Sequence, residues 1–264
     1  MENILQMKTS QTDSSFGPSV QVLPARADAE VLVVCEHASN HVPACLNDLG
    51  LSGDVLQSHV AWDPGALGVA QHLASVFNGP LVQGEISRLV YDCNRPPEAA
   101  DAIPARSEIY EILGNADLTP KQRQKRVDRV YEPFRAALAD EIATRRSALR
   151  LMVTVHSFTP VYRGQKRDVE IGILHGNDAR FAEAMMATQP GGSPYLTLMN
   201  EPYSAADGVA HTLDLHGTTN DLPSVMLEIR NDLITTGTEQ VKMSNMLAAW
   251  IERALQQFDR GSQA

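Results

Sequence analysis

The chain has 264 residues, 43% of them hydrophobic, and carries a formal net charge of −10 at pH 7. These values suit a folded α/β protein and exclude an intrinsically disordered chain. They also argue against nucleic acid or an acidic membrane surface as a partner, because both bind to a basic protein face.

The cysteine spacing and the hydropathy of the sequence indicate which cellular compartment to expect. Cys35, Cys45 and Cys93 are scattered without a Cys-x-x-Cys spacing, so neither a disulfide framework nor a cysteine zinc site is indicated. Residues 1–18 are polar, and no run approaches the roughly 18 apolar residues that a membrane span requires. We therefore expect a cytoplasmic protein.

The N-terminal part divides into an arm and the start of a domain. Residues 1–27 are rich in Ser, Thr and Gln, so we expect a loose arm or lid there and a single α/β hydrolase domain over 28–264. The five apolar residues 31–35 predict a strand buried on both faces, as parallel sheets require. Glu36 and His37 follow at its carboxyl end, where open α/β sheets place their ligand sites.

Strands and helices then alternate along the chain. A helix is predicted to begin just after Asp63, with Pro64 at its first position. A longer helix begins at Thr119-Pro120, and Pro133 should kink or divide it. Further strands are predicted at 80–82, 151–155, 169–174, 195–199 and 224–231, and a final helix from about 238. This alternation predicts a mostly parallel or mixed central sheet with helices on both faces.

Two histidines and an aspartate form a candidate metal site. His37 and His156 each follow a buried aliphatic strand, and Asp63 precedes a helix. Two imidazoles and one carboxylate are the protein ligands of a catalytic zinc whose fourth position holds water. Asp63 is also a candidate helix cap, a role compatible with metal binding. Glu36 points away from His37 in an extended chain, so it is the alternative carboxylate ligand or a supporting partner.

Glu228 interrupts the apolar strand at 224–231. Burying a carboxylate is costly without a compensating interaction, and burial raises its pKa. A carboxylate with a raised pKa suits a general base that takes a proton from water and returns it to a leaving amine. The alternative is a buried ion pair with a neighbouring arginine.

Cationic side chains lie near the predicted strand ends: Arg88, Arg95 and Arg230. A guanidinium binds a carboxylate through two parallel hydrogen bonds, so these residues predict a small anionic substrate. Asp92 and Asn94 are expected to hold Arg88 and Arg95 or to hydrogen-bond the substrate. His211 or His216, in a polar loop, could close over the site.

Five stretches in order, spanning roughly residues 30–255, resemble the N-formylglutamate amidohydrolase family: Cys35-Glu36-His37-Ala38-Ser39, Ala61-Trp62-Asp63-Pro64-Gly65-Ala66, Ser87-Arg88-Leu89-Val90-Tyr91-Asp92-Cys93-Asn94-Arg95-Pro96, Val155-His156-Ser157 and Leu227-Glu228-Ile229. The resemblance implies a zinc-carboxypeptidase-like (phosphorylase/hydrolase-like) α/β fold. It also implies hydrolysis of a formamide or related amide on an amino acid.

The resemblance also implies roles for particular residues. It implies zinc ligands at His37, Asp63 and His156, a base at Glu228, and binding of the substrate carboxylates by Arg88 and Arg95. With the candidates taken from the residues themselves, the expected substrate-binding set is Arg88, Asp92, Asn94, Arg95 and Arg230, and Glu36 and Ser157 are expected to support the ligands. In zinc carboxypeptidases the carboxylate ligand stands three residues after the first histidine, where this chain has Asn40.

The turn after the first strand reads Glu-His-Ala-Ser-Asn, whereas family members of histidine degradation have a Pro-His-Ala-Gly type of sequence. We therefore expect N-formyl-L-glutamate or a related N-acyl amino acid as substrate. The alternatives are a carboxypeptidase or cell-wall amidase of the same fold, and a metal- or ligand-binding protein without turnover.

Overall fold

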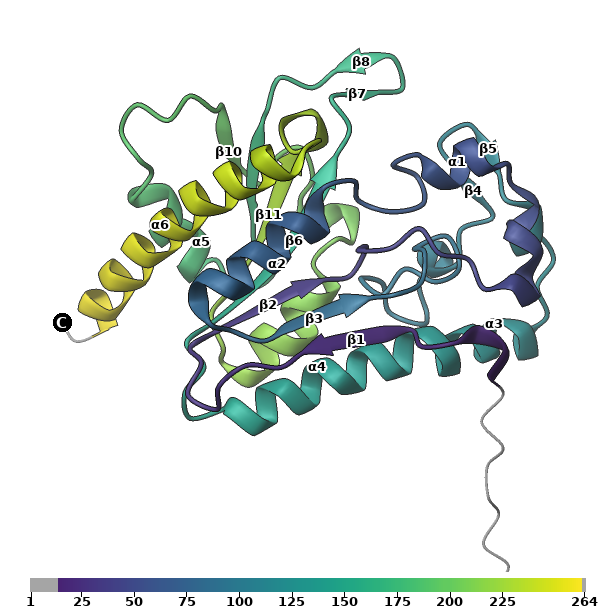
Figure 1. Cartoon of the computed structure of the whole chain (residues 1–264), viewed down its shortest axis with the longest axis horizontal. Helices are drawn as coiled ribbons and strands as arrows, with labels where there is room; N and C mark the ends of the chain where they lie inside the picture. The colour runs from purple at the N-terminus through teal and green to yellow at the C-terminus, as the bar shows by residue number, and fades with distance from the viewer. Residues whose placement is uncertain (1–13, 263–264) are drawn as a thin grey trace, which may run out of the picture.

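A seven-stranded mixed sheet forms the centre of the computed structural model, which describes residues 14–262 (Figure 1). Its strands, in spatial order, are β1 (Val20–Leu23), β3 (Leu81–Gly84), β2 (Val31–Cys35), β6 (Leu151–Phe158), β11 (Ser224–Arg230), β9 (Ile171–Leu174) and β10 (Thr197–Met199). The four strands β3, β2, β6 and β11 run parallel. β1 is antiparallel to β3, and β9 is antiparallel to β11. The predicted mostly parallel sheet is confirmed.

Two short hairpins and six α-helices surround the sheet. The hairpins pair β4 (Arg106–Ser107) with β5 (Tyr110–Glu111) and β7 (Val161–Tyr162) with β8 (Gln165–Lys166). The helices are α1 (Gly53–Gln57), α2 (Ala66–Phe77), α3 (Pro120–Arg126), α4 (Glu132–Arg145), α5 (Arg180–Ala187) and α6 (Gly237–Ser262). Within residues 14–262, no helix combines the length and the hydropathy needed to cross a bilayer.

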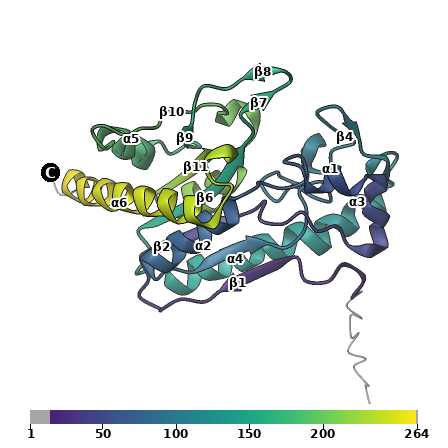
Figure 2. The same ribbon diagram turned by 45° about the horizontal axis from the view of Figure 1, so that its top comes forward.

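Alternating side chains of the central strands build two separate cores. Val31 and Val33 of β2 point to the face covered by α2, α5 and α6. Leu32 and Val34 point to the opposite face, where α4 and the 86–112 segment pack. Figures 1 and 2 show α2 and α6 on one side of the sheet and α4 on the other. Each fully buried Val or Leu stabilises the fold by about 1.5–3 kcal/mol, so strands apolar at every position require helices on both faces.

Two predicted boundaries need correction. Residues 20–23, predicted as part of a loose arm, form β1 and pair with β3, because their backbone completes the edge of the sheet. Residues 1–13 lie outside the described part of the chain. The helix predicted from Pro64 begins instead at Ala66, because Gly65 adopts a left-handed conformation with φ of 83°.

The long helix after Thr119 is divided near Pro133, as predicted. A π-helical turn, Val127–Tyr131, separates α3 from α4, and Pro133 occupies the first turn of α4. Proline lacks the amide proton of a regular helical bond, and the wider turn before it accommodates that loss. Thr119 caps α3 and forms a reciprocal capping box with Gln122.

Candidate active site

Three neighbouring parallel strands deliver chemical groups to one edge of the sheet. His37 follows β2, His156 lies in the last half of β6, and Glu228 is paired in register with His156 on β11. Paired residues on adjacent strands project to the same side of a sheet, so His156 and Glu228 are neighbours. Asp63 comes from the loop before α2, and its backbone N–H donates to the His37 carbonyl at 3.0 Å.

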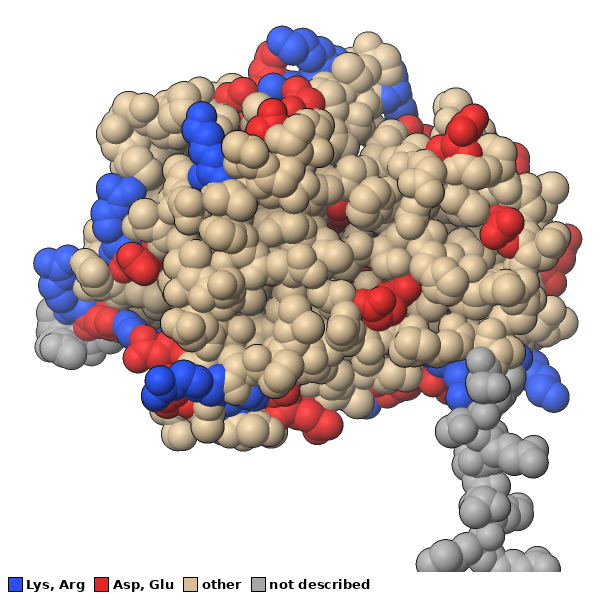
Figure 3. Space-filling model, in the orientation of Figure 1, with Lys and Arg blue, Asp and Glu red and all other residues tan. Residues whose placement is uncertain are grey.

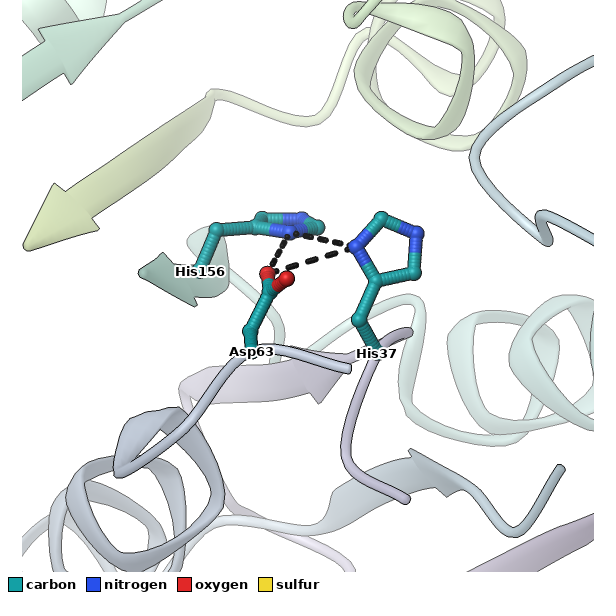
Figure 4. A group of neighbouring side chains, drawn as sticks. All are labelled: His37, Asp63 and His156. Carbon is teal, nitrogen blue, oxygen red and sulfur yellow. Dashed lines mark hydrogen bonds and ion pairs between the residues drawn. The ribbon is translucent and has the colours of Figure 1, made fainter. Parts of the chain in front are cut away.

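The side chains of His37, Asp63 and His156 converge on one point (Figure 4). The Nδ1 atoms of the two histidines are 3.2 Å apart, and they lie 3.3 and 2.9 Å from Oδ2 of Asp63. Tetrahedral ligands at about 2.0–2.1 Å from a zinc ion would be separated by about 3.3 Å. All three side chains are buried. The spacing therefore fits a divalent metal.

A carboxylate lies behind each imidazole. His37 Nε2 is 2.7 Å from Oδ1 of Asp92, and His156 Nε2 is 3.1 Å from Oε2 of Glu36. A nearby carboxylate favours the tautomer with its N–H at Nε2, so a neutral ring would carry its lone pair at Nδ1, which faces Asp63. Three electron-rich atoms then point at one another, and a cation between them would relieve their repulsion.

Without a metal ion, the surrounding carboxylates instead favour protonated imidazoles, so a bound cation would take the place of that positive charge. Burial and Arg88 lower the pKa of His37, but Asp92 and Asp63 outweigh them and raise it above its usual value. Burial opposes ionisation of Asp63, yet the positive His37 and hydrogen bonds from both histidines hold its pKa well below the usual range. The Asp63 carboxylate is therefore charged near neutral pH.

The geometry separates the two carboxylates that the sequence left as alternatives. Asp63 does not cap α2, whose first turn has no side-chain cap. Its Oδ2 instead contacts both imidazoles and the Ser157 N–H, the last at 3.3 Å. Glu36, fully buried, lies on the far side of His156. Asp63 is thus the carboxylate of the candidate metal group, and Glu36 is a supporting partner.

Glu228 faces the same cavity without a partner of its own. Its side chain is 5% exposed, and it forms no ion pair with any residue that the structure describes. Burial, and next the negative charge of Asp63, raise the pKa of Glu228 to about 7, against the opposing effects of His156, Arg88 and His37. The alternative of a buried ion pair is therefore not what the structure shows.

A pocket of about 590 Å³ opens over these groups, and its wall contains the candidate metal group, Glu228 and several arginines. Arg88 lies in this wall with 30% of its side chain exposed, and it donates to Asp63 at 3.3 Å and Asp92 at 2.9 Å. Asp92 therefore holds Arg88 and His37, one of its two predicted roles. Its oxygens already accept from His37, Asn94 and Arg88, and the predicted contact with substrate stays a prediction.

Asn94 and Arg95 also line the pocket, but they are tied to its wall. The Asn94 amide donates to Val209 O and accepts from Thr212 N. Arg95 donates to Asp101 at 2.9 Å and to the carbonyls of Asn94 and Gly208. Both residues thus fix the 207–212 segment, and Asn94 holds the Arg95 side chain through its backbone carbonyl rather than its side chain.

Arg230 is not brought to the pocket. Its guanidinium donates to Glu170 at 3.3 Å and Asp232 at 2.8 Å, outside the pocket wall. The substrate-binding role predicted for Arg230 is therefore wrong. Arg230 is the last residue of β11, with its side chain on the opposite side from Ile229, and the sequence alone does not reveal which acids lie there.

Other histidines are placed differently from the prediction. His211 hydrogen-bonds with the Tyr131 hydroxyl at 2.9 Å, His216 is buried, and neither lines the pocket. His59 lies in the pocket wall and pairs with Glu108 at 2.8 Å. The Ser157 Oγ donates to Pro64 O at 2.8 Å, next to Asp63, and its supporting role stays a prediction.

The pocket wall also contains residues that sequence reasoning missed, chiefly Arg167 and Tyr203. Both lie in loops without apolar periodicity, so no sequence pattern indicates which way they point. The one available signal is the cluster of basic residues at 163–167, which follows the strand end at His156.

The model of the N-formylglutamate amidohydrolase family matches residues 29–235. Among curated proteins, none matches the chain. The crystal structure of gene product Atu2144 from Agrobacterium tumefaciens is similar, with a TM-score of 0.89 and 49% identity over 92% of this chain and 97% of that one. N-formylglutamate amidohydrolase from Ralstonia eutropha JMP134 has a TM-score of 0.60 and 17% identity over 92% and 99%. The zinc-carboxypeptidase-like fold implied by the sequence is thereby confirmed.

Proposed function

The chain belongs to the N-formylglutamate amidohydrolase family, and we propose that it is a zinc-dependent hydrolase of N-formyl-L-glutamate or a closely related N-acyl amino acid. The observation that carries the proposal is the convergence of His37, Asp63 and His156 beside the unpaired Glu228 carboxylate. A binding protein without turnover would have little use for a buried carboxylate with a pKa of about 7 beside a metal group.

We assign the metal to the Nδ1 atoms of the two histidines and to Asp63, with Asp92 and Glu36 orienting the rings. Imidazole and carboxylate donors with an open fourth position are typical of catalytic zinc. When bound, zinc would polarise the scissile carbonyl and lower the pKa of a bound water to about 7.

Glu228 would move the proton. Its carboxylate takes a proton from the attacking water as the new C–O bond forms, and the same proton then passes to the amide nitrogen as the C–N bond breaks. The products are formate, or a short carboxylic acid, and a free amino acid. A carboxylate with a pKa of about 7 is suited to both steps, because it accepts and releases a proton near neutral pH.

Arg88 would bind the substrate carboxylate closest to the reacting amide. It contacts Asp63 directly, its side chain is 30% exposed to the pocket, and an α-carboxylate lies only two bonds from the amide nitrogen. Its two contacts with Asp63 and Asp92 leave further guanidinium N–H groups to face an anion.

The test combines metal analysis with product detection. Purified protein should contain about one zinc ion per chain, and it should release formate from N-formyl-L-glutamate faster than from neutral N-formyl amino acids. Glu228→Gln should retain the metal and lose at least about 100-fold in kcat. A metal-free folded protein, or a Glu228→Gln variant with full activity, would contradict the proposal.

A further inference from the structure

Two arginines of the pocket wall, Arg163 and Arg167, have no carboxylate partner within the described residues; Arg163 is exposed, whereas Arg167 is half-buried. Arg88 is bound to Asp63 and Asp92, and Arg95 is bound to Asp101. Arg167 lines the same pocket, and its guanidinium donates a long hydrogen bond of 3.4 Å to the Thr159 carbonyl. A partly buried guanidinium without a carboxylate partner still has N–H groups that can donate to an anion.

Aromatic rings hold the Arg167 guanidinium in place. Its Cζ lies 4.5 Å from the ring centre of Tyr162, 4.8 Å from that of Tyr203 and 5.5 Å from that of Phe158. Ring faces attract a cation without satisfying its N–H donors, so these contacts orient the fork and leave its N–H groups available. The surrounding rings also restrict the rotamers of Arg167, which lowers the entropy lost when an anion binds.

The backbone of Arg167 is also anchored. Its N–H donates to Pro160 O at 2.8 Å and closes the base of the β7–β8 hairpin. Its carbonyl accepts from Arg230 at 3.3 Å. Basic side chains gather over this hairpin at the top of Figure 3. The charge of Arg167 is therefore fixed at the rim of the pocket rather than carried on a free loop end.

Tyr203 links Arg167 to the reacting groups. Burial and the negative charge of Glu228 raise the pKa of Tyr203 to about 12, and Arg167 and Arg88 act on it in the opposite direction. Tyr203 is thus close to both Arg167 and Glu228. Arg88 contacts Asp63 of the metal group directly, whereas no hydrogen bond or ion pair joins Arg167 to that group within the described residues.

We propose that Arg167 binds the side-chain carboxylate of the substrate, while Arg88 faces the α-carboxylate beside the scissile amide. The inference rests on the proposed function and narrows its substrate class to N-acyl amino acids with an acidic side chain. It makes Arg167 a specificity residue. The preference for an acidic over an amide side chain then comes from a residue outside the motifs shared with the family.

The test measures binding without turnover in the Glu228→Gln background, loaded with zinc. Isothermal titration compares N-formyl-L-glutamate with N-formyl-L-glutamine, which differ only in the charge of the side chain. Glu228→Gln should bind the acid about tenfold or more tightly than the amide, the size expected for a hydrogen-bonded charge pair. Adding Arg167→Gln should abolish this preference, and Arg167→Lys, which keeps the charge without the planar fork, should retain part of it.

Lys166→Gln is the matched control. It removes one positive charge from the same hairpin, but Lys166 pairs with Asp168 at 3.3 Å and lies outside the pocket wall, so the preference should persist. If the preference for the acid is unchanged after Arg167→Gln, or is lost equally after Lys166→Gln, the role of Arg167 is wrong. The proposed function is then unaffected. If Glu228→Gln binds neither compound, the proposed substrate class fails and the inference fails with it.

Discussion

Asp92 and Glu36 lie where they determine which nitrogen of each imidazole carries the proton and which can bind a metal. Asp92 lies 2.7 Å from His37 Nε2, and Glu36 lies 3.1 Å from His156 Nε2. Both carboxylates are buried, and both have pKa values below the usual range, because nearby histidine charge outweighs the burial that would raise them. They can therefore hold protons at Nε2 and leave Nδ1 for a metal.

Replacing either carboxylate by its amide should weaken zinc binding. We expect Asp92→Asn and Glu36→Gln each to lower zinc affinity by about 10–100-fold, as loss of such a supporting carboxylate typically does. Competition with a chromogenic chelator measures the affinity. Asp101→Asn is the control, because Asp101 pairs with Arg95 and contacts no histidine. Unchanged affinity in both variants would show that the rings do not depend on these carboxylates.

Ionisation of Glu228 should determine how kcat/KM falls at acid pH. Its pKa of about 7 means that the ionised base is depleted as pH falls below 7, so kcat/KM should decrease there and level off above it. The residual activity of Glu228→Gln should lack this limb. Initial rates from pH 5.5 to 9 at saturating zinc provide the check; an identical acid limb in the variant would assign it to another group.

At the scale of elements, the loop before α2 must place Asp63 against two strands. Gly65 makes this possible: its φ is 83°, and a Cβ there would lie 2.4 Å from Ile234 O. The backbone turns sharply between Asp63 and the helix, and the α6 side of the fold closes directly on it. Only glycine tolerates both conditions.

Gly65→Ala should therefore affect stability and the metal site together. We expect a loss of at least about 2 kcal/mol in the free energy of unfolding, together with weaker zinc binding, because the clash must displace the loop that carries Asp63. Gly192→Ala is the matched control, since φ is 76° there but no atom lies within 4 Å of the added Cβ. Urea denaturation and chelator competition on both variants separate backbone strain from the clash.

The stability of the whole molecule should depend on the buried His216. Burial, with smaller contributions from His211 and Arg135, lowers the pKa of His216 from 6.5 to about 4. Between these values the unfolded chain binds a proton that the folded chain does not. The folded state therefore has its full stability with respect to this group above about pH 6.5. It loses free energy of unfolding as the pH falls toward 4.

Replacing His216 by leucine should reduce this acid sensitivity. From pH 7 to 4.5 the native protein should lose about 2–3 kcal/mol through this group, and His216→Leu should lose that much less. Urea denaturation at both pH values, with a chelator present so that metal release does not contribute, measures the difference. Equal losses in the two proteins would contradict the prediction.

The residue types and the apolar periodicity of the sequence were sufficient to predict the central strands and the edge of the sheet where the candidate site lies. The apolar runs at 31–35, 151–155 and 224–231 predict buried strands, because a strand covered on both faces has no polar alternation. Their polar endings predict that His37, His156 and Glu228 meet, because parallel strands end at one edge of a sheet. The structure places these groups together, with Asp63 completing the set.

Only the tertiary structure decided which charged groups face the pocket. Arg230 was expected there but pairs with Glu170 and Asp232, whereas Arg167, in a loop without periodicity, lines the wall. Asp92 has its oxygens bound to His37 and Arg88. The strand β9 runs antiparallel to β11, a direction that apolar spacing does not encode. The two-residue alternation of a strand determines which face of the sheet each side chain lies on. The direction of an arginine side chain in a loop depends instead on the acidic and aromatic side chains that distant segments place next to it.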